Sequence, residues 1–280
     1  MRLLAASLIA TALLASASPA FAVTRGAVAR NPNGLRQSVV RVESSRGELC
    51  SGAVIAADLV LTAAHCIDDR AGYRVVVMDR NFRPRTVRAV AAAMHPAFVP
   101  GTTPRTQPGV DLAILKLERP LGADFVALDP RYAGRVNGGE PVQIAGFGVD
   151  KEGNKKSARV LRQTQLMSLG TMQVANRVVV AVDAERRART TGAGACRGDS
   201  GGPILRGGPG GYQLVGIVSW SSGALSSRTR SACGGITAVT PIAEHANWIA
   251  ARAADMQRLQ PGMAMPGTAP GNPADWRDDR

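Results

Sequence analysis

Three short motifs contain residues whose types and order suit nucleophilic catalysis. Ser200 lies in the glycine-dense run 198–203, where its hydroxyl can be exposed and backbone amides can converge beside it. A hydroxyl is a poor nucleophile at neutral pH, so it needs an imidazole to accept its proton and a carboxylate to orient that imidazole. His65 follows Thr-Ala-Ala and precedes Cys66, and Asp111 begins an apolar run. We predict that Ser200, His65 and Asp111 act as nucleophile, general base and orienting acid.

The chain order His, Asp, Ser and the motifs around these residues resemble the chymotrypsin or trypsin family of serine endopeptidases. Subtilisin-like proteins and α/β-hydrolases place their three residues in other orders. The resemblance runs over residues 38–249 and is that of a bacterial secreted member of the family. It implies acyl-enzyme chemistry on protein or peptide substrates. We expect a monomer that uses no cofactor and no metal.

The resemblance also implies roles for the neighbours of Ser200. The amides of Gly198 and Ser200 would hold the developing oxyanion, and a side chain at Gly198 would crowd the substrate oxygen. Asp199 resembles the family's activation partner, which pairs with a newly exposed amino terminus. Because the family's Arg followed by Ile-Val-Gly-Gly is absent, we hypothesise that removal of a leader exposes Val23 as that partner.

Specificity is predicted from positions that match the family's primary pocket. Gly194 corresponds to the base of this pocket, and Ser221 and Gly235 correspond to its walls. None of the three is charged, so we expect a preference for neutral, apolar or small side chains. Ser219, Trp220 and Ser221 should form the edge strand that pairs with the substrate backbone.

Two alternatives to this interpretation stay open. The segment 222–232 is longer than in digestive members and includes Arg228 and Arg230. Together with Arg197, these arginines could make the enzyme selective for acidic side chains. The chain could also be a protease-like binding protein without activity, although none of the three catalytic residue types is lost.

The cysteines and the first residues both indicate an oxidising compartment. Four cysteines allow three pairings, and the family resemblance selects Cys50 with Cys66 and Cys196 with Cys233. No close cysteine pair is matched by a histidine pair, which argues against a zinc site.

Residues 1–22 read as a secretory signal peptide, with one early arginine, an apolar run and small residues before the cleavage site. About 20 apolar residues are needed to cross a bilayer, and the apolar run is shorter, so we expect no membrane span. The signal peptide predicts a secreted or periplasmic protein. Starts at Gly26 or Asn31 are the alternatives to a start at Val23.

The formal net charge of +13 comes mainly from arginines scattered along the chain. Aromatic residues make up 4% of the sequence, so the stacking platforms that bind single-stranded nucleic acid are mostly missing. We therefore expect no nucleic-acid partner.

Short β-branched runs separated by Gly, Pro, Asn and Asp predict an all-β fold. The runs are 39–42, 75–77, 86–90, 114–117, 142–145, 178–182, 213–218 and 236–239. With the family resemblance they imply two six-stranded antiparallel β-barrels, over residues 23–130 and 131–240, with the catalytic groups between them.

A C-terminal helix is predicted over residues 241–260. Its apolar face would contain Ile242, Ala246, Ile249 and Ala253, with Trp248 close by. The Pro- and Gly-rich residues 261–280 are predicted to be a disordered tail. Neither His95 nor His245 lies in a catalytic motif, so we expect both to be structural or surface residues.

Overall fold

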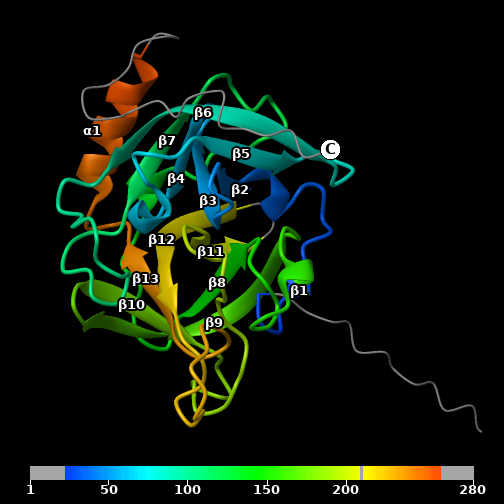
Figure 1. The fold of residues 1–280 in the computed structure, drawn as a ribbon, viewed down its shortest axis with the longest axis vertical. Helices are drawn as coiled ribbons and strands as arrows, with labels where there is room; N and C mark the ends of the chain where they lie inside the picture. Colours follow the sequence, from blue (N-terminus) through cyan, green and yellow to red (C-terminus); the bar gives the residue numbers. More distant parts are fainter. Residues whose placement is uncertain (1–22, 209–210, 260–280) are drawn as a thin grey trace, which may run out of the picture.

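The computed structural model describes residues 23–208 and 211–259. In this part of the chain, strands form two antiparallel barrels that lie one above the other, and the helix α1 lies beside the upper one (Figure 1). The all-β prediction of two six-stranded barrels with a C-terminal helix is confirmed. The predicted signal peptide, residues 1–22, and the predicted tail, residues 261–280, lie outside the described residues.

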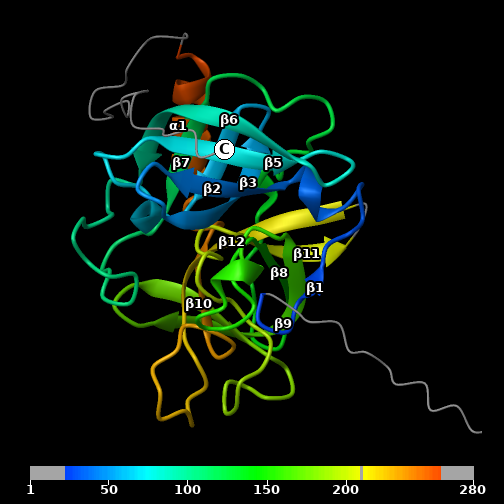
Figure 2. The ribbon, with the colours of Figure 1, turned by 45° about the vertical axis from the view of Figure 1, so that its right-hand side comes forward.

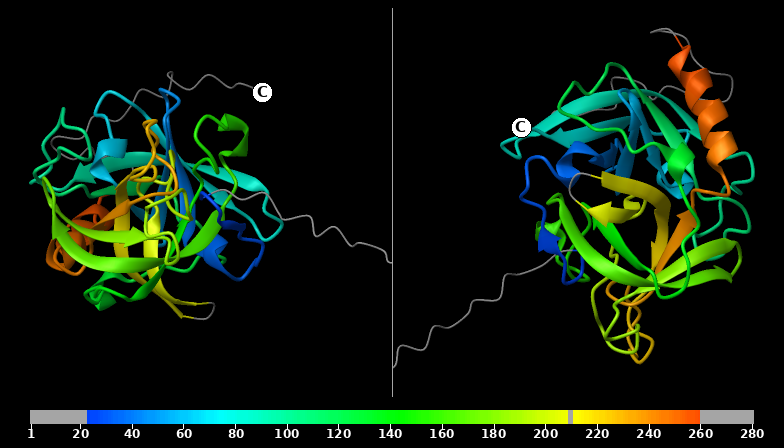
Figure 3. Two further views of the ribbon diagram at one scale, coloured as in Figure 1. Left: turned by 90° about the horizontal axis from the view of Figure 1, so that it is seen from below. Right: turned by 180° about the vertical axis from the view of Figure 1, so that it is seen from behind.

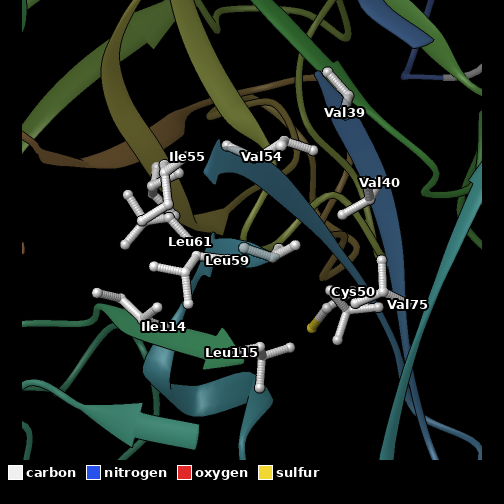
Figure 4. Close-up of a cluster of buried hydrophobic side chains, with 14 of the residues drawn as sticks. Val39, Val40, Cys50, Val54, Ile55, Leu59, Leu61, Val75, Ile114 and Leu115 are labelled. Atoms are coloured by element: carbon white, nitrogen blue, oxygen red, sulfur yellow. The ribbon is translucent and has the colours of Figure 1, made fainter. Parts of the chain in front are cut away.

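The first barrel closes in the order β2-β3-β4-β7-β6-β5. Its strands are β2 (Val39–Ser44), β3 (Leu49–Ala56), β4 (Leu59–Thr62), β5 (Tyr73–Met78), β6 (Pro84–Met94) and β7 (Ala113–Leu117). β-Branched residues such as Val40 and Val75 favour extended backbone. Figure 4 shows these valines with Leu61 and Leu115 inside the barrel, where they are almost completely buried.

The second barrel contains β8 (Pro141–Gly146), β9 (Arg162–Gln173), β10 (Arg177–Val182), β11 (Pro203–Gly208), β12 (Gly211–Ser221) and β13 (Thr237–Pro241). The strand order is β9-β10-β13-β12-β11-β8, and pairing of β8 with β9 closes the barrel. The short strand β1 (Ala27–Val28) pairs with β9 (Figure 2). Residues 23–28 therefore lie on the second barrel, although the sequence-based division counts them with the first.

Four single-turn 3₁₀ helices lie in the connections of the described residues: η1 (Leu35–Gln37), η2 (Ala64–Cys66), η3 (Pro130–Tyr132) and η4 (Lys155–Ser157). The chain passes from the first barrel to the second between β7 and β8. This connection contains η3, where Asp129 accepts a hydrogen bond from the Arg131 amide and Pro130 sits at the first helical position.

The helix α1 spans Ala246–Gln257 and therefore begins later than predicted. The reason is that Pro241 still belongs to β13 and pairs with Gly216 of β12, and the Ile242 amide donates to the Val215 carbonyl. Although α1 follows the second barrel in the chain, its buried Ile249 packs into the core of the first barrel. Figure 3 shows the helix along the flank of that barrel. Within residues 23–208 and 211–259, no helix is long and apolar enough to cross a membrane.

Candidate active site

His65 lies in η2, the turn that directly follows β4 of the first barrel. The next residue, Cys66, forms a disulfide with Cys50 of β3, and this crosslink ties the turn to the barrel wall. The imidazole is 19% exposed, so it is reachable from solvent while its backbone is held firmly.

Asp111 is completely buried just before β7 and accepts three hydrogen bonds. One carboxylate oxygen accepts from the His65 amide at 2.9 Å, and the other lies 2.8 Å from Nδ1 of His65. The Ser219 hydroxyl, from β12 of the second barrel, donates to the same oxygen. Burial alone would raise the pKa of Asp111, but the charge and hydrogen bonds of His65, together with Ser219, hold that pKa below its ordinary value. The acid is therefore ionised and can orient the imidazole.

Ser200 lies in the turn that leads into β11, and this turn packs against the first barrel. The Ser200 carbonyl accepts a hydrogen bond from the Ser51 amide at 2.8 Å. A side chain at Gly201 would lie 2.1 Å from Oγ1 of Thr62, so only glycine permits the approach to the strand that precedes His65. In the described part of the chain, the Ser200 hydroxyl forms no hydrogen bond with His65, whose Nε2 lies 3.9 Å from Sγ of Cys66. Such bonds are often long before substrate binds.

The amides of Gly198 and Ser200 are available as donors. Gly198 has a φ of +93°, and a Cβ there would lie 2.9 Å from Cα of Gly148. The Arg197 carbonyl accepts from the Val149 amide at 2.9 Å. In a trans peptide the carbonyl and the following N–H point in opposite directions, so the Gly198 N–H points away from Val149. Among the described residues, neither amide has an acceptor, so this turn offers two free donors beside the Ser200 hydroxyl.

Asp199 is fully buried behind the turn. One of its carboxylate oxygens accepts from the Gly148 amide and the other from the Cys196 amide, each at 2.9 Å. Burial raises the pKa of Asp199 to about 7, and these two hydrogen bonds and the charge of Arg162 offset only part of that effect. The buried carboxyl therefore lacks a close cationic partner in the described residues.

Val23 is completely buried among core residues of the second barrel. The next residue, Thr24, forms a bridge with Gly194, whose amide donates to the Thr24 carbonyl at 3.2 Å. No hydrogen bond or ion pair joins Val23 to Asp199 within the described residues. In this chain the nitrogen of Val23 is an uncharged peptide amide.

The residues matched to the substrate pocket come together at the end of β12. Trp220 and Ser221 lie opposite Ala238 and Thr237 of β13, and Ser219 is buried against Asp111. A Cβ on the buried Gly194 would lie 3.4 Å from Oγ1 of Thr237, which is ordinary contact. A Cβ on Gly235 would lie 2.0 Å from the Gly223 carbonyl, so the segment after β12 closes tightly over this position.

Two residues near the site were missed by the sequence analysis. Ser51 donates its hydroxyl to the Gly198 carbonyl at 2.9 Å and accepts from the Phe147 amide at 3.0 Å. Glu152 forms an ion pair with Arg197 and accepts from the Ala232 amide at 2.7 Å. The position of Ser51 directly after Cys50 was the available signal for the first residue, and no motif marks the second.

The two disulfides that the resemblance implies are both formed, Cys50–Cys66 and Cys196–Cys233. Cys50, His65 and Cys66 bring potential metal-ligating atoms within 4.8 Å of one another. Because both sulfurs of this cluster are in a disulfide, they are not thiolates, the form in which cysteine binds a metal. In this cluster His65 is therefore the one residue left with a metal-ligating atom.

The rings of the other two histidines lie together, and neither ring contacts Asp111 in the described residues, although the His95 amide donates to the Leu112 carbonyl at 2.8 Å. The ring of His95 is 5.1 Å from the His245 ring and 4.7 Å from the Trp248 ring, measured between centroids. The structure thus places them at the start of α1.

Two antiparallel barrels, with a His–Asp pair on the first and a glycine-flanked serine on the second, are the architecture of the chymotrypsin-like class. The family model described as Trypsin matches residues 25–249. The chain therefore belongs to the trypsin family of serine proteases.

Individual relatives are distant. The chain is 29% identical over 232 residues to a trypsin-like protease of Streptomyces glaucescens, which covers 78% of this chain and 81% of the relative. It is 27% identical over 228 residues to human chymotrypsin-like elastase family member 1, covering 75% and 83%. The solved structure of human heparin binding protein superposes with a TM-score of 0.63 at 23% identity, over 86% of this chain and 100% of that one. This last similarity shows a shared fold only.

Proposed function

We propose that this protein is a secreted serine endopeptidase in which Ser200 attacks the carbonyl carbon of a peptide bond. His65 accepts the hydroxyl proton as the new C–O bond forms, and donates it to the leaving amine as the C–N bond breaks. A water molecule, deprotonated by His65, then attacks the acyl carbon, and the bond from this carbon to Oγ of Ser200 breaks as His65 returns the proton to Oγ. Asp111 keeps the imidazole in the required tautomer and stabilises its cation.

The observation that carries this proposal is the buried Asp111 carboxylate, which accepts both from the backbone and from the ring of His65. Two bonds to one residue fix the imidazole in position as well as in tautomer. The free amides of Gly198 and Ser200 support the proposal, because such donors stabilise the negative charge that develops on the substrate oxygen.

The primary pocket is proposed to take small, neutral side chains. Gly194, Ser221 and Gly235 bring no charge to it, and the Gly223 carbonyl crowds the Gly235 wall. The acidic alternative is weakened because Arg197 is paired with Glu152. Arg228 and Arg230 are exposed in the segment that follows Ser221.

Activity is tested by labelling purified mature protein with a fluorophosphonate and by profiling cleavage of a peptide library, each beside Ser200→Ala. We expect Ser200-dependent labelling and cleavage after small neutral residues. Because the triad acts as one unit, Ser200→Ala and His65→Ala should each lower kcat by a similar large factor, and the double variant should be little worse. Absence of Ser200-dependent label would favour the protease-like binding protein.

A further inference from the structure

Arg105 reaches from the loop between β6 and β7 of the first barrel to the end of β12 in the second. Its Nη2 donates to the Ser221 carbonyl at 2.9 Å. Its guanidinium carbon lies 5.2 Å from the centroid of the Trp220 ring, a cation–π distance. The arginine is exposed, and among the described residues these two contacts are the ones that hold its charged end in place.

The Ser221 carbonyl belongs to a strand edge that is otherwise unpaired. Ser222 uses its amide and its carbonyl to pair with the β13 side, through Ile236 and Gly235. Backbone groups of successive strand residues point in opposite directions, so those of Ser221 point away from β13. On that opposite side, the pairing of β12 with β11 ends at Ile217.

This edge lies directly beside the turn of the nucleophile. The Gly201 amide donates to the Val218 carbonyl at 2.8 Å, and the Val218 amide donates to Gly202 at 2.9 Å. An extended peptide with its scissile carbonyl at Ser200 can therefore add to the edge at Ser219 and Ser221. Arg105 occupies one of the acceptors that such a peptide needs.

We propose that Arg105 is a specificity-determining residue that selects substrates with an Asp or Glu side chain over Trp220. This residue would be one of the second to fourth residues on the N-terminal side of the scissile bond. The inference rests on the proposed endopeptidase function and adds a second recognition site, distinct from the primary pocket.

The selection follows from the partners of Arg105. A neutral peptide must displace the guanidinium from the Ser221 carbonyl and offers it no charged group in return. A carboxylate on the peptide offers the guanidinium two charge-assisted hydrogen bonds, which frees the carbonyl for a peptide N–H. Within residues 23–208 and 211–259, Arg105 forms no ion pair. Other exposed arginines, such as Arg197 and Arg80, each form an ion pair with a carboxylate.

Cleavage of peptides that differ in one residue tests the proposal. Each peptide has a small neutral residue before the scissile bond and carries Asp, Asn, Glu or Gln at the second, third or fourth position. For the wild type we expect kcat/KM to be about fivefold higher for Asp than for Asn at one of these positions, since partly exposed ion pairs contribute on that scale. This ratio should fall in 0.5 M NaCl, which screens exposed charges.

Arg105→Ala and Arg105→Gln should both bring this ratio close to one, because glutamine keeps a donor but loses the charge. The matched control is Arg85→Ala. Arg85 also donates to a backbone carbonyl, that of Leu121, and lies 5.7 Å from the Phe125 ring, but it is on β6 of the first barrel. Arg85→Ala should keep the wild-type ratio.

A binding readout separates this inference from the proposed function. The same peptides, fluorescently labelled, are titrated against Ser200→Ala protein with and without Arg105→Ala, and their anisotropy is measured. If the wild type shows no Ser200-dependent cleavage, the endopeptidase function fails, and a preference for acidic peptides that needs Arg105 still supports the subsite. The subsite proposal is overturned if neither readout shows an acidic preference, or if the preference persists without Arg105.

Discussion

Asp111 is a charged group with no contact to solvent, and its position depends on both barrels. Its hydrogen bonds from His65 come from the first barrel, and the bond from Ser219 comes from the second. A buried carboxylate that loses one donor is less well stabilised as an anion. The Ser219 hydroxyl therefore supports the orientation of His65 without touching substrate through that group.

Ser219→Ala should lower kcat/KM by about tenfold, because a hydrogen bond to a charged group contributes roughly 1.5 kcal/mol. The loss should be greatest at low pH, since removal of the donor raises the pKa of Asp111 toward its ordinary value. The pH profile of kcat/KM measures both effects.

The matched control for this variant is Ser168→Ala. Ser168 is also fully buried, but its hydroxyl accepts from the Gly170 amide in β9, away from Asp111. It should change thermal stability without altering the shape of the pH profile. An unchanged kcat/KM in Ser219→Ala would show that His65 alone positions the acid.

Individual residues differ in how far the sequence reveals them. Ser200 and His65 could be predicted because catalysis requires these residue types in short, distinctive motifs. Glu152 and Arg105 could not be predicted, because each contacts a segment far away in the chain, and Ser51 had only its position after Cys50 as a signal. Arg105, for example, meets Ser221 only because the two barrels pack against each other.

Among the elements, the β-branched runs predicted strands well. Seven of the eight runs lie wholly in a strand of the structure, and the run 236–239 begins one residue before β13. The predicted runs did not include β1, β3, β4, β9 or β11. β3 contains Gly52, where a Cβ would lie 2.6 Å from a methyl group of Val60, so packing demands a residue of low strand propensity. β9 is mostly polar, and its pairing with β8 and β10 defines it as a strand. Long-range pairing of this kind leaves little local signal.

The helix α1 packs against His95 through His245 and Trp248, and this contact is sensitive to pH. Burial, and then the charge of nearby His245, lower the pKa of His95 to about 4. The Nδ1 of His95 also accepts from the Ala97 amide at 3.2 Å, which favours the unprotonated ring. His95 in the folded chain is therefore still neutral at pH values at which a histidine of the unfolded chain becomes protonated.

Stability of the folded chain should fall as the pH drops from about 6.5 toward 4, because the unfolded state binds a proton that His95 in the folded state refuses. His95→Gln removes this contribution, so its melting temperature should fall less than that of the wild type between pH 7 and 4.5. Calorimetry at both values checks this expectation. An equal fall in both proteins would mean that other groups cause the acid sensitivity.

At the scale of the whole molecule, the site is assembled from two barrels whose relative position is set by a few hydrogen bonds. Ser51 of the first barrel binds both Gly198 and Ser200 of the second. The segment that contains these two residues is anchored further back by Asp199. Whatever changes the charge state of Asp199 therefore affects the donors beside the nucleophile.

An amino group at Val23 would be well placed to change the charge state of Asp199. Val23 is buried in the second barrel, and Thr24 bridges to Gly194, five residues before Asp199. Cleavage before Val23 would convert its uncharged amide nitrogen into an ammonium group. Insertion of that ammonium beside Asp199 would lower the pKa of the carboxyl from about 7 and hold the turn of Ser200.

A protein that starts at Val23 should therefore be active, and a protein that starts one residue earlier, at Ala22, should have a kcat/KM lower by about 10²-fold or more. Loss of one member of a buried ion pair costs roughly 3 kcal/mol or more, which corresponds to such a factor. Activity of the Val23 form should decline at alkaline pH as the ammonium loses its proton. Asp199→Asn should reduce the Val23 form to the level of the extended one and leave the extended form nearly unchanged. Equal activity of the two forms, or active enzyme whose first residue is Gly26 or Asn31, would contradict this route of activation.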